Sequence, residues 1–147
     1  MKINNKNNGF TLLELLISIC VFIAISGLTL IAFNEYMPKY RLRSATSLLL
    51  MDLTKTRYTA VKSNKDYQML LPGVESNNYE IKEVDSEDIF LTREFSSPEY
   101  KGLLIKAQDD PIFHPNGTIE NLTGIEVTNG SNSMNITMTV TGRIKNQ

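Results

Sequence analysis

Cysteine, histidine and tryptophan are nearly missing from this chain. Its 147 residues include one cysteine, one histidine and no tryptophan. A single cysteine cannot form an intrachain disulfide, which excludes a disulfide-stapled scaffold. A metal site built from several histidines or cysteines is excluded as well, and a histidine-based catalytic site would rest on His114 alone. We find no nucleophile–base pair, metal-ligand spacing or phosphate-binding loop, so we expect no enzymatic activity, no cofactor and no metal.

A large net charge is also missing. Lysine and arginine together number 15 and aspartate and glutamate 16, for a net charge of −1. This balance excludes a strongly basic nucleic-acid binder and a highly charged disordered chain. The mean hydropathy of −0.17 is that of a soluble protein, but the apolar residues are concentrated in one segment, which contains Cys20.

That segment carries no charged residue from Leu15 to Asn34. A helix of about 20 residues is roughly 30 Å long, which is enough to span the hydrocarbon core of a bilayer. The stretch is too long for a cleaved secretory signal, whose apolar part has roughly 7–15 residues. A buried core helix and a plain membrane anchor remain as alternatives. Glu14 argues against the plain anchor, because a carboxylate at the start of such a helix is costly unless it has a partner.

The residues around Glu14 form a motif. A polar leader with Lys2 and Lys6 is followed by Gly9-Phe10-Thr-Leu-Leu-Glu14 and then by the apolar segment. This arrangement resembles the class III signal of type IV pilins and type II secretion pseudopilins. The resemblance implies that a prepilin peptidase cleaves between Gly9 and Phe10 and N-methylates Phe10. It also implies that Glu14 neutralises the amino group of a neighbouring subunit's Phe10 during filament assembly.

Apolar and small residues continue the helical pattern beyond this segment. One face of an amphipathic helix is predicted by steps of three and four between Leu42, Ala45, Leu49, Leu53, Thr56 and Ala60. The helix should run from Phe10 to about Lys62, and Pro38 should kink or locally open it.

Short strands separated by turns should follow the helix. We predict them at Tyr67–Leu71, Asn78–Val84, Ile89–Phe95, Gly102–Ala107, Ile125–Thr128 and in the alternating stretch Met134–Val140. The expected fold is therefore α+β and pilin-like, with a long N-terminal transmembrane and stalk helix packed on a C-terminal antiparallel β domain. The expected organisation is a leader at 1–9, a transmembrane half-helix at 10–35, an amphipathic half-helix at 36–65 and a β-rich domain at 66–147.

Charge is segregated along the chain. Residues 39–65 contain seven bases and one acid, Asp52, whereas residues 66–110 contain eleven acids and four bases. Three interpretations are open: two solvated surfaces, complementary packing between filament subunits, or contact of the basic segment with anionic lipid headgroups.

A second resemblance lies near the C-terminus. Phe113-His114-Pro115-Asn116-Gly117-Thr118, with Met138 to Ile144 downstream, is similar to the C-terminal pattern of GspH/FimT-type minor pseudopilins, in which a closing strand ends in Gly-Arg. Small competence pseudopilins of Gram-positive bacteria have a similar layout. Some FimT-like members bind DNA through a terminal basic segment, which Gly142-Arg143-Ile144-Lys145 resembles, with Lys145 in place of the second arginine.

Together these features predict a minor pilin or pseudopilin. It would be a single-pass protein of the cytoplasmic membrane, with its C-terminal domain outside the cytoplasm, and would prime or join a filament with other pilins. The filament could serve type II secretion, a type IV pilus or competence. The alternatives are a competence pseudopilin that contacts DNA through Arg143 and Lys145, and a major pilin.

Overall fold

A computed structural model describes residues 9–71, 75–86, 88–96, 100, 102–121 and 124–146, without the side chains of residues 28–32, 34 and 35. The chain divides into two compact units, Met1–Met37 and Pro38–Gln147. The leader predicted at residues 1–9 lies outside the described residues except for Gly9.

One helix, α1, runs from Leu12 to Ser63 over 52 residues. The predicted helix is thus confirmed to within two residues at each end. Its backbone stays helical through Pro38, so of the two effects predicted there the local opening is wrong, and the kink stays a prediction. The helix stops because Asn64 adopts a left-handed conformation with φ of 55°. The amide of Lys65 then donates to the carbonyl of Ala60 at 3.3 Å, which caps the last turn.

The rest of the second unit is antiparallel β structure. The described strands are β1 (Tyr67–Leu70), β2 (Glu75–Ser76), β3 (Asn78–Glu83), β4 (Ile89–Glu94), β5 (Leu104–Lys106), β6 (Ile112–Phe113), β7 (Ile119–Glu120), β8 (Ile125–Thr128), β9 (Ser133–Met138) and β10 (Ile144–Asn146). They form two five-stranded sheets: sheet A in the order β4-β3-β1-β6-β7, and sheet B in the order β10-β9-β8-β5-β2. The α+β architecture expected from the sequence is confirmed.

One predicted strand is wrong at its end. The alternating stretch that begins at Met134 stops at Met138, and Val140 is 57% exposed instead of facing the core. The chain turns here, since the amide of Gly142 donates to the carbonyl of Thr139 at 2.8 Å and Gly142 has φ of 81°. Gly142 and Arg143 therefore lie in a turn, and the closing strand β10 follows them rather than ending at them.

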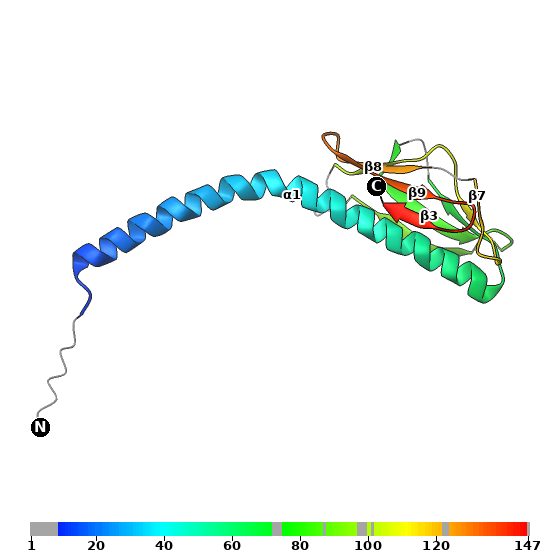
Figure 1. Ribbon diagram of the computed structural model, residues 1–147, viewed down its shortest axis with the longest axis horizontal. Helices are drawn as coiled ribbons and strands as arrows, with labels where there is room; N and C mark the ends of the chain where they lie inside the picture. Colours follow the sequence, from blue (N-terminus) through cyan, green and yellow to red (C-terminus); the bar gives the residue numbers. More distant parts are fainter. Residues whose placement is uncertain are drawn as a thin grey trace, which may run out of the picture. The chain divides into compact units, whose positions relative to one another are not determined.

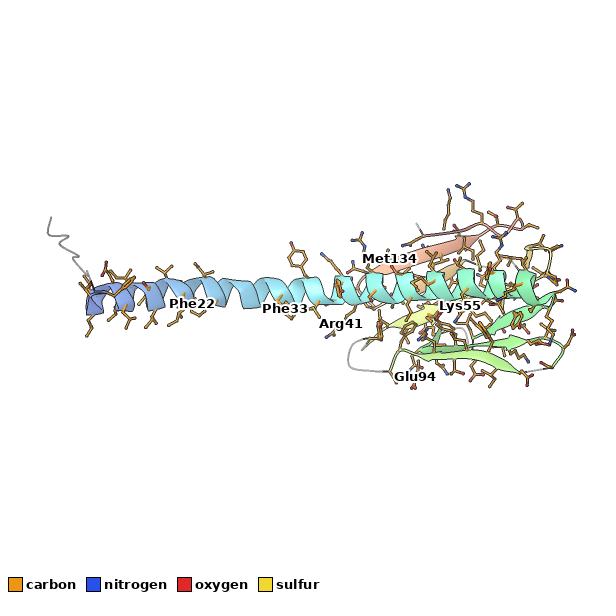
Figure 2. All side chains as sticks on the ribbon, turned by 90° about the horizontal axis from the view of Figure 1, so that it is seen from below. Phe22, Phe33, Arg41, Lys55, Glu94 and Met134 are labelled. Carbon is orange, nitrogen blue, oxygen red and sulfur yellow. The ribbon has the colours of Figure 1, made fainter. Side chains whose placement is uncertain are left out.

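The core forms where one face of α1 packs against both sheets. Figure 1 shows the strands gathered on one side of the cyan-to-green part of α1. In the view of Figure 2, orange strands of sheet B and green strands of sheet A extend on either side of the helix axis. The predicted helical stripe is fully buried, with Leu42, Ala45, Leu49, Leu53, Thr56 and Ala60 all at 3% exposure or less. Thr56 can be buried because its hydroxyl donates to the carbonyl of Asp52 at 2.7 Å.

A buried carboxylate joins the helix to sheet A. Asp52, on α1, is 5% exposed. Its Oδ2 accepts a hydrogen bond from the Tyr79 hydroxyl of β3 at 2.7 Å and from the Arg93 Nε of β4 at 3.0 Å, and its Oδ1 accepts from the Arg93 guanidinium at 3.3 Å. Burial and the bond to Asp52 raise the pKa of Tyr79 far above its usual value, so the phenol keeps its proton and remains a donor.

A second polar cluster, centred on His114, joins the segment after α1 to strands of sheet A. His114 follows β6, and its Nδ1 lies 3.0 Å from the Asp66 carboxylate, just after α1. Its Nε2 lies 3.1 Å from the Glu120 carboxylate of β7. The hydrogen bond to Asp66 is the largest cause that raises the pKa of His114 above 6.5, with a smaller contribution from Glu120. The protonated ring can donate to both carboxylates, which a neutral ring cannot.

We predict that Asp52→Ala lowers the free energy of unfolding by roughly 2–4 kcal/mol, because it leaves the Tyr79 hydroxyl and the Arg93 guanidinium without their acceptor. Tyr79→Phe should cost about 1 kcal/mol, since only one bond is lost. Thermal unfolding of the full chain in detergent, followed by near-ultraviolet circular dichroism, measures both. The control is Asp85→Ala, which removes an exposed acid. An Asp52→Ala variant as stable as this control would contradict the role of the carboxylate.

We also predict that His114 makes stability depend on pH. Because its folded pKa is raised, the stabilisation is complete below about pH 6.5, the usual value, and is lost as pH rises through the folded value. The melting temperature should therefore fall as pH rises above about 6.5 and through the folded pKa of His114. His114→Gln should remove this slope. The single histidine gives one imidazole NMR signal, and a titration midpoint at or below 6.5 would contradict the prediction.

Candidate functional site

The predicted cleavage site lies just before α1. Gly9 and Phe10 are non-helical and exposed, with Phe10 at 85%. The helix begins at Leu12 because Thr11 and Glu14 form a capping box. The amide of Thr11 donates to Glu14 Oε2 at 2.9 Å, and the amide of Glu14 donates to the Thr11 hydroxyl oxygen at 3.3 Å. The bond between Gly9 and Phe10 thus lies in an exposed segment outside the helix, where its backbone is not held by helical hydrogen bonds.

Glu14 has its hydrogen bonds within its own chain. Its Oε2 also accepts from the Thr11 hydroxyl at 3.0 Å. The resemblance implies a partner for Glu14 on another subunit, whereas in the structure its hydrogen-bond partner is Thr11 of the same chain. The Thr11-x-x-Glu14 spacing is the signal that identifies it. A carboxylate held by an amide and a hydroxyl is stabilised at the helix start without any counter-charge.

The helix after Glu14 presents an apolar surface. Large side chains from Leu12 to Ile25 are more than half exposed in the single chain. Two of its hydroxyls are bonded within the helix, since Ser18 donates to the carbonyl of Glu14 and Ser26 to the carbonyl of Phe22, both at 2.8 Å. Within the part of the chain that the structure describes, no helix is both long enough and apolar enough to cross a membrane.

Arg57 brings the two C-terminal motifs together. Its Nε donates to the carbonyl of Gly117 at 2.9 Å, and its guanidinium donates to the carbonyl of Thr141 at 3.4 Å. Gly117 and Gly142 both have φ of 81°, in the region that favours glycine. A Cβ at Gly142 would overlap the Arg57 guanidinium and the Gly117 carbonyl. The two motifs are therefore one structural unit built around a helix arginine.

The Phe113–Thr118 motif contains a tight turn. The amide of Gly117 donates to the carbonyl of His114 at 2.9 Å, and the amide of His114 donates to the carbonyl of Thr118 at 3.0 Å. Asn116 Oδ1 accepts from the Thr118 amide at 2.9 Å. His114 is thus the first residue of a tight turn. Of its two carboxylate partners, Asp66 lies 48 residues away in the sequence and Glu120 six residues away, and neither was predicted.

Arg143 and Lys145 both have exposed side chains. They stand two residues apart at β10, which is the edge strand of sheet B, so they lie on one face of that edge. Among the described residues, neither side chain has a hydrogen bond or an ion pair. These residues belong to the second unit, whereas Gly9, Phe10 and Glu14 belong to the first.

No metal site is evident in the described ranges, since no three histidine, cysteine, aspartate or glutamate side chains gather there in a suitable arrangement. The polar clusters around Asp52, Arg57 and His114 hold elements together, and each carboxylate or guanidinium in them contacts its own chain.

The chain is similar to a protein of known structure. No protein-family model matches the chain, and no curated protein matches it. Two solved structures match: both are the type IV minor pilin FimU of Pseudomonas aeruginosa, in different crystal forms. One has a TM-score of 0.63 at 17% identity and covers 76% of this chain and 92% of FimU. The other has a TM-score of 0.59 at 17% identity and covers 72% and 92%.

The match to FimU extends over most of both chains, and its identity is low enough that it carries the fold alone. The two matching proteins are pilins, not enzymes, which agrees with the expectation from composition and motifs. The resemblance first drawn from residues 9–14 and 113–118 is thereby supported by independent evidence. This chain has the fold of type IV pilins, with a long helix packed on an antiparallel β domain.

Proposed function

We propose that the chain is a minor pilin or pseudopilin, a structural subunit that primes or joins a type IV pilus-like filament. It is stored in the cytoplasmic membrane through residues 10–35, with the β domain outside the cytoplasm. A prepilin peptidase removes residues 1–9 and methylates Phe10. The mature subunit then assembles with other pilins, and its work is mechanical.

One observation carries this proposal. The processing motif stands at the start of the helix of a pilin fold, with Gly9 and Phe10 exposed and α1 beginning two residues later. A chance match to Gly-Phe-Thr-Leu-Leu-Glu would have no reason to occur at this position. The helix also exposes large apolar side chains on all sides in its first half, a surface that needs lipid or neighbouring helices to cover it.

Glu14 has a defined part in this proposal. The apolar surface around it makes an unpaired carboxylate costly, and Thr11 meets that cost in the single chain. Docking exchanges these neutral donors for the ammonium group of a neighbouring Phe10. The ammonium group adds the attraction of an opposite charge in apolar surroundings, which the neutral donors of Thr11 lack, so the exchange favours assembly.

We predict that the protein isolated from its native membrane has lost residues 1–9 and gained one methyl group. Intact-mass spectrometry of the protein with and without the prepilin peptidase measures this. Gly9→Val should block cleavage, because a β-branched side chain replaces the glycine at the scissile bond. Leu13→Val, also in an exposed position, is the matched control and should be cleaved. A chain left uncut in the presence of the enzyme, or cut near Asn34, would overturn the proposal.

Contact with DNA through Arg143 and Lys145 is the second candidate function. The observation that favours it is the exposure of both side chains on one edge of sheet B. Two cations at this spacing can contact adjacent phosphates. A major pilin role has no comparable observation in its favour.

If this candidate is correct, the full chain retards duplex DNA at low salt, and Arg143→Ala/Lys145→Ala lowers the slope of log affinity against log salt by about 1.8 for two lost phosphate contacts. A gel-shift series in increasing salt measures the slope. The control removes one exposed arginine and one exposed lysine elsewhere, as Arg43→Ala/Lys62→Ala. No retardation by the unaltered chain, or an equal loss in the control, would exclude specific contact at this edge.

A further inference from the structure

Arg41 lies beside a small cavity in the second unit. The cavity has a volume of ≈230 Å³ and is lined by Pro38, Arg41, Leu103, Asn129 and Ser131. Figure 2 shows Arg41 on α1 at the end of the β domain where the second unit begins. Pockets for larger organic ligands are roughly 300–1,000 Å³, so this cavity suits a small group.

One donor of the Arg41 guanidinium, the buried Nε, has no hydrogen-bond acceptor among the described residues. Arg57 and Arg93, in contrast, donate to a carbonyl and to a carboxylate. A buried donor without an acceptor is costly, and a guanidinium is the side chain that best binds carboxylate or phosphate oxygens in pairs. An anion bound in the cavity would supply the missing acceptor.

The other lining residues add donors and fix the rim. Asn129 Nδ2 donates to the carbonyl of Pro38 at 3.3 Å, and Asn129 Oδ1 accepts from the amides of Ser131 and Asn132 at 3.1 and 2.8 Å. These bonds hold the loop between β8 and β9 against α1. The Ser131 hydroxyl has no partner in the described part of the chain, so it can donate to a ligand.

The position of the cavity selects the anion, and this step rests on the proposed function. The membrane segment proposed there ends at residue 35, and Arg41 follows six residues later, or about 9 Å of helix. This is just beyond a headgroup layer of about 5–8 Å. Because helical side chains tilt toward the N-terminus, an arginine at this position can reach back to lipid phosphates. Lys39 and Arg43 are exposed on either side of Arg41 and attract anionic lipids. We propose that Arg41, with Ser131, binds the phosphodiester of an anionic glycerophospholipid and so seats the β domain at the membrane surface.

The test uses the full chain in phosphorus-free maltoside micelles. Phosphorus NMR titrations with dihexanoyl-phosphatidylglycerol and, separately, with inorganic phosphate give the two affinities. We expect Arg41→Gln to weaken lipid binding about tenfold or more, because a charge-assisted pair is lost. Lys62→Gln removes one positive charge from an exposed side chain in the last turn of α1 and should leave the affinity within about twofold.

A second variant blocks the cavity without removing Arg41, so that loss of binding does not depend on one substitution that could impair folding. Ser131→Asp places a carboxylate in the cavity, keeps Arg41 and should abolish lipid binding by occupying its guanidinium. Equal lipid affinity in Arg41→Gln, Ser131→Asp and the unaltered chain would overturn the proposal. Inorganic phosphate bound as tightly as the lipid, with the same dependence on Arg41, would make this a general phosphate site and would overturn the lipid assignment.

A carboxylate of a neighbouring subunit is the competing occupant. Filament crosslinks lost in Arg41→Gln without any loss of lipid binding would assign the cavity to that carboxylate and overturn the lipid proposal. Failure here is separate from failure of the proposed function, because soluble lipid binding needs no cleavage at Gly9, and cleavage at Gly9 needs no lipid at Arg41.

Discussion

Burial of one helical stripe is the constraint on which the second unit depends. Leu49 and Leu53 have no exposed surface, although they lie on a helix that has no second helix beside it in the described unit. Both sheets must therefore pack against this one face of the helix, and neither could bury its inner face without it. Positions bordering the stripe are left to carry polar groups: Asp52 toward sheet A and Arg57 toward the C-terminal turns. The sheets are thus fastened to the helix at the edges of the apolar contact, where a hydrogen bond also fixes their rotation about it.

The periodic parts of this fold could be predicted, and the aperiodic parts could not. The helix and the strands near residues 67, 78, 89, 104, 125 and 134 follow from apolar spacing over four or more residues. Strands β2, β6 and β7 have two residues each, too few for any alternation to be seen. The turn at Gly142 was mistaken for strand because Val140 continues the alternation in sequence while its side chain is exposed in space. What stops the strand is Arg57, some 80 residues earlier, which occupies the space beside Gly142.

The polar clusters also could be predicted only in part. Asp52 was visible as the one acid among seven bases, and its neighbours at Leu49 and Leu53 place it next to the buried stripe. Those two facts together already call for a basic partner. They cannot say that the partner is Arg93, because that residue reaches Asp52 only through the pairing of β3 with β4. For His114, neither partner has a local signal. Residue types and burial can therefore be anticipated from sequence, whereas the identity of a partner depends on sheet register.

The two ends of the helix solve one problem by different means. At the C-terminal end, polar groups are satisfied by residues far away in the chain, which ties them to a folded β domain. At the N-terminal end, Glu14 is satisfied by Thr11, three residues away, and needs no tertiary structure. A local solution is what a subunit must have if this end is to change partners during its life. Under the proposed function the carboxylate is in apolar surroundings before assembly and beside an ammonium afterwards. The capping box stabilises the Glu14 carboxylate before assembly. Because its donors are neutral, the ammonium group of a neighbouring subunit can replace them.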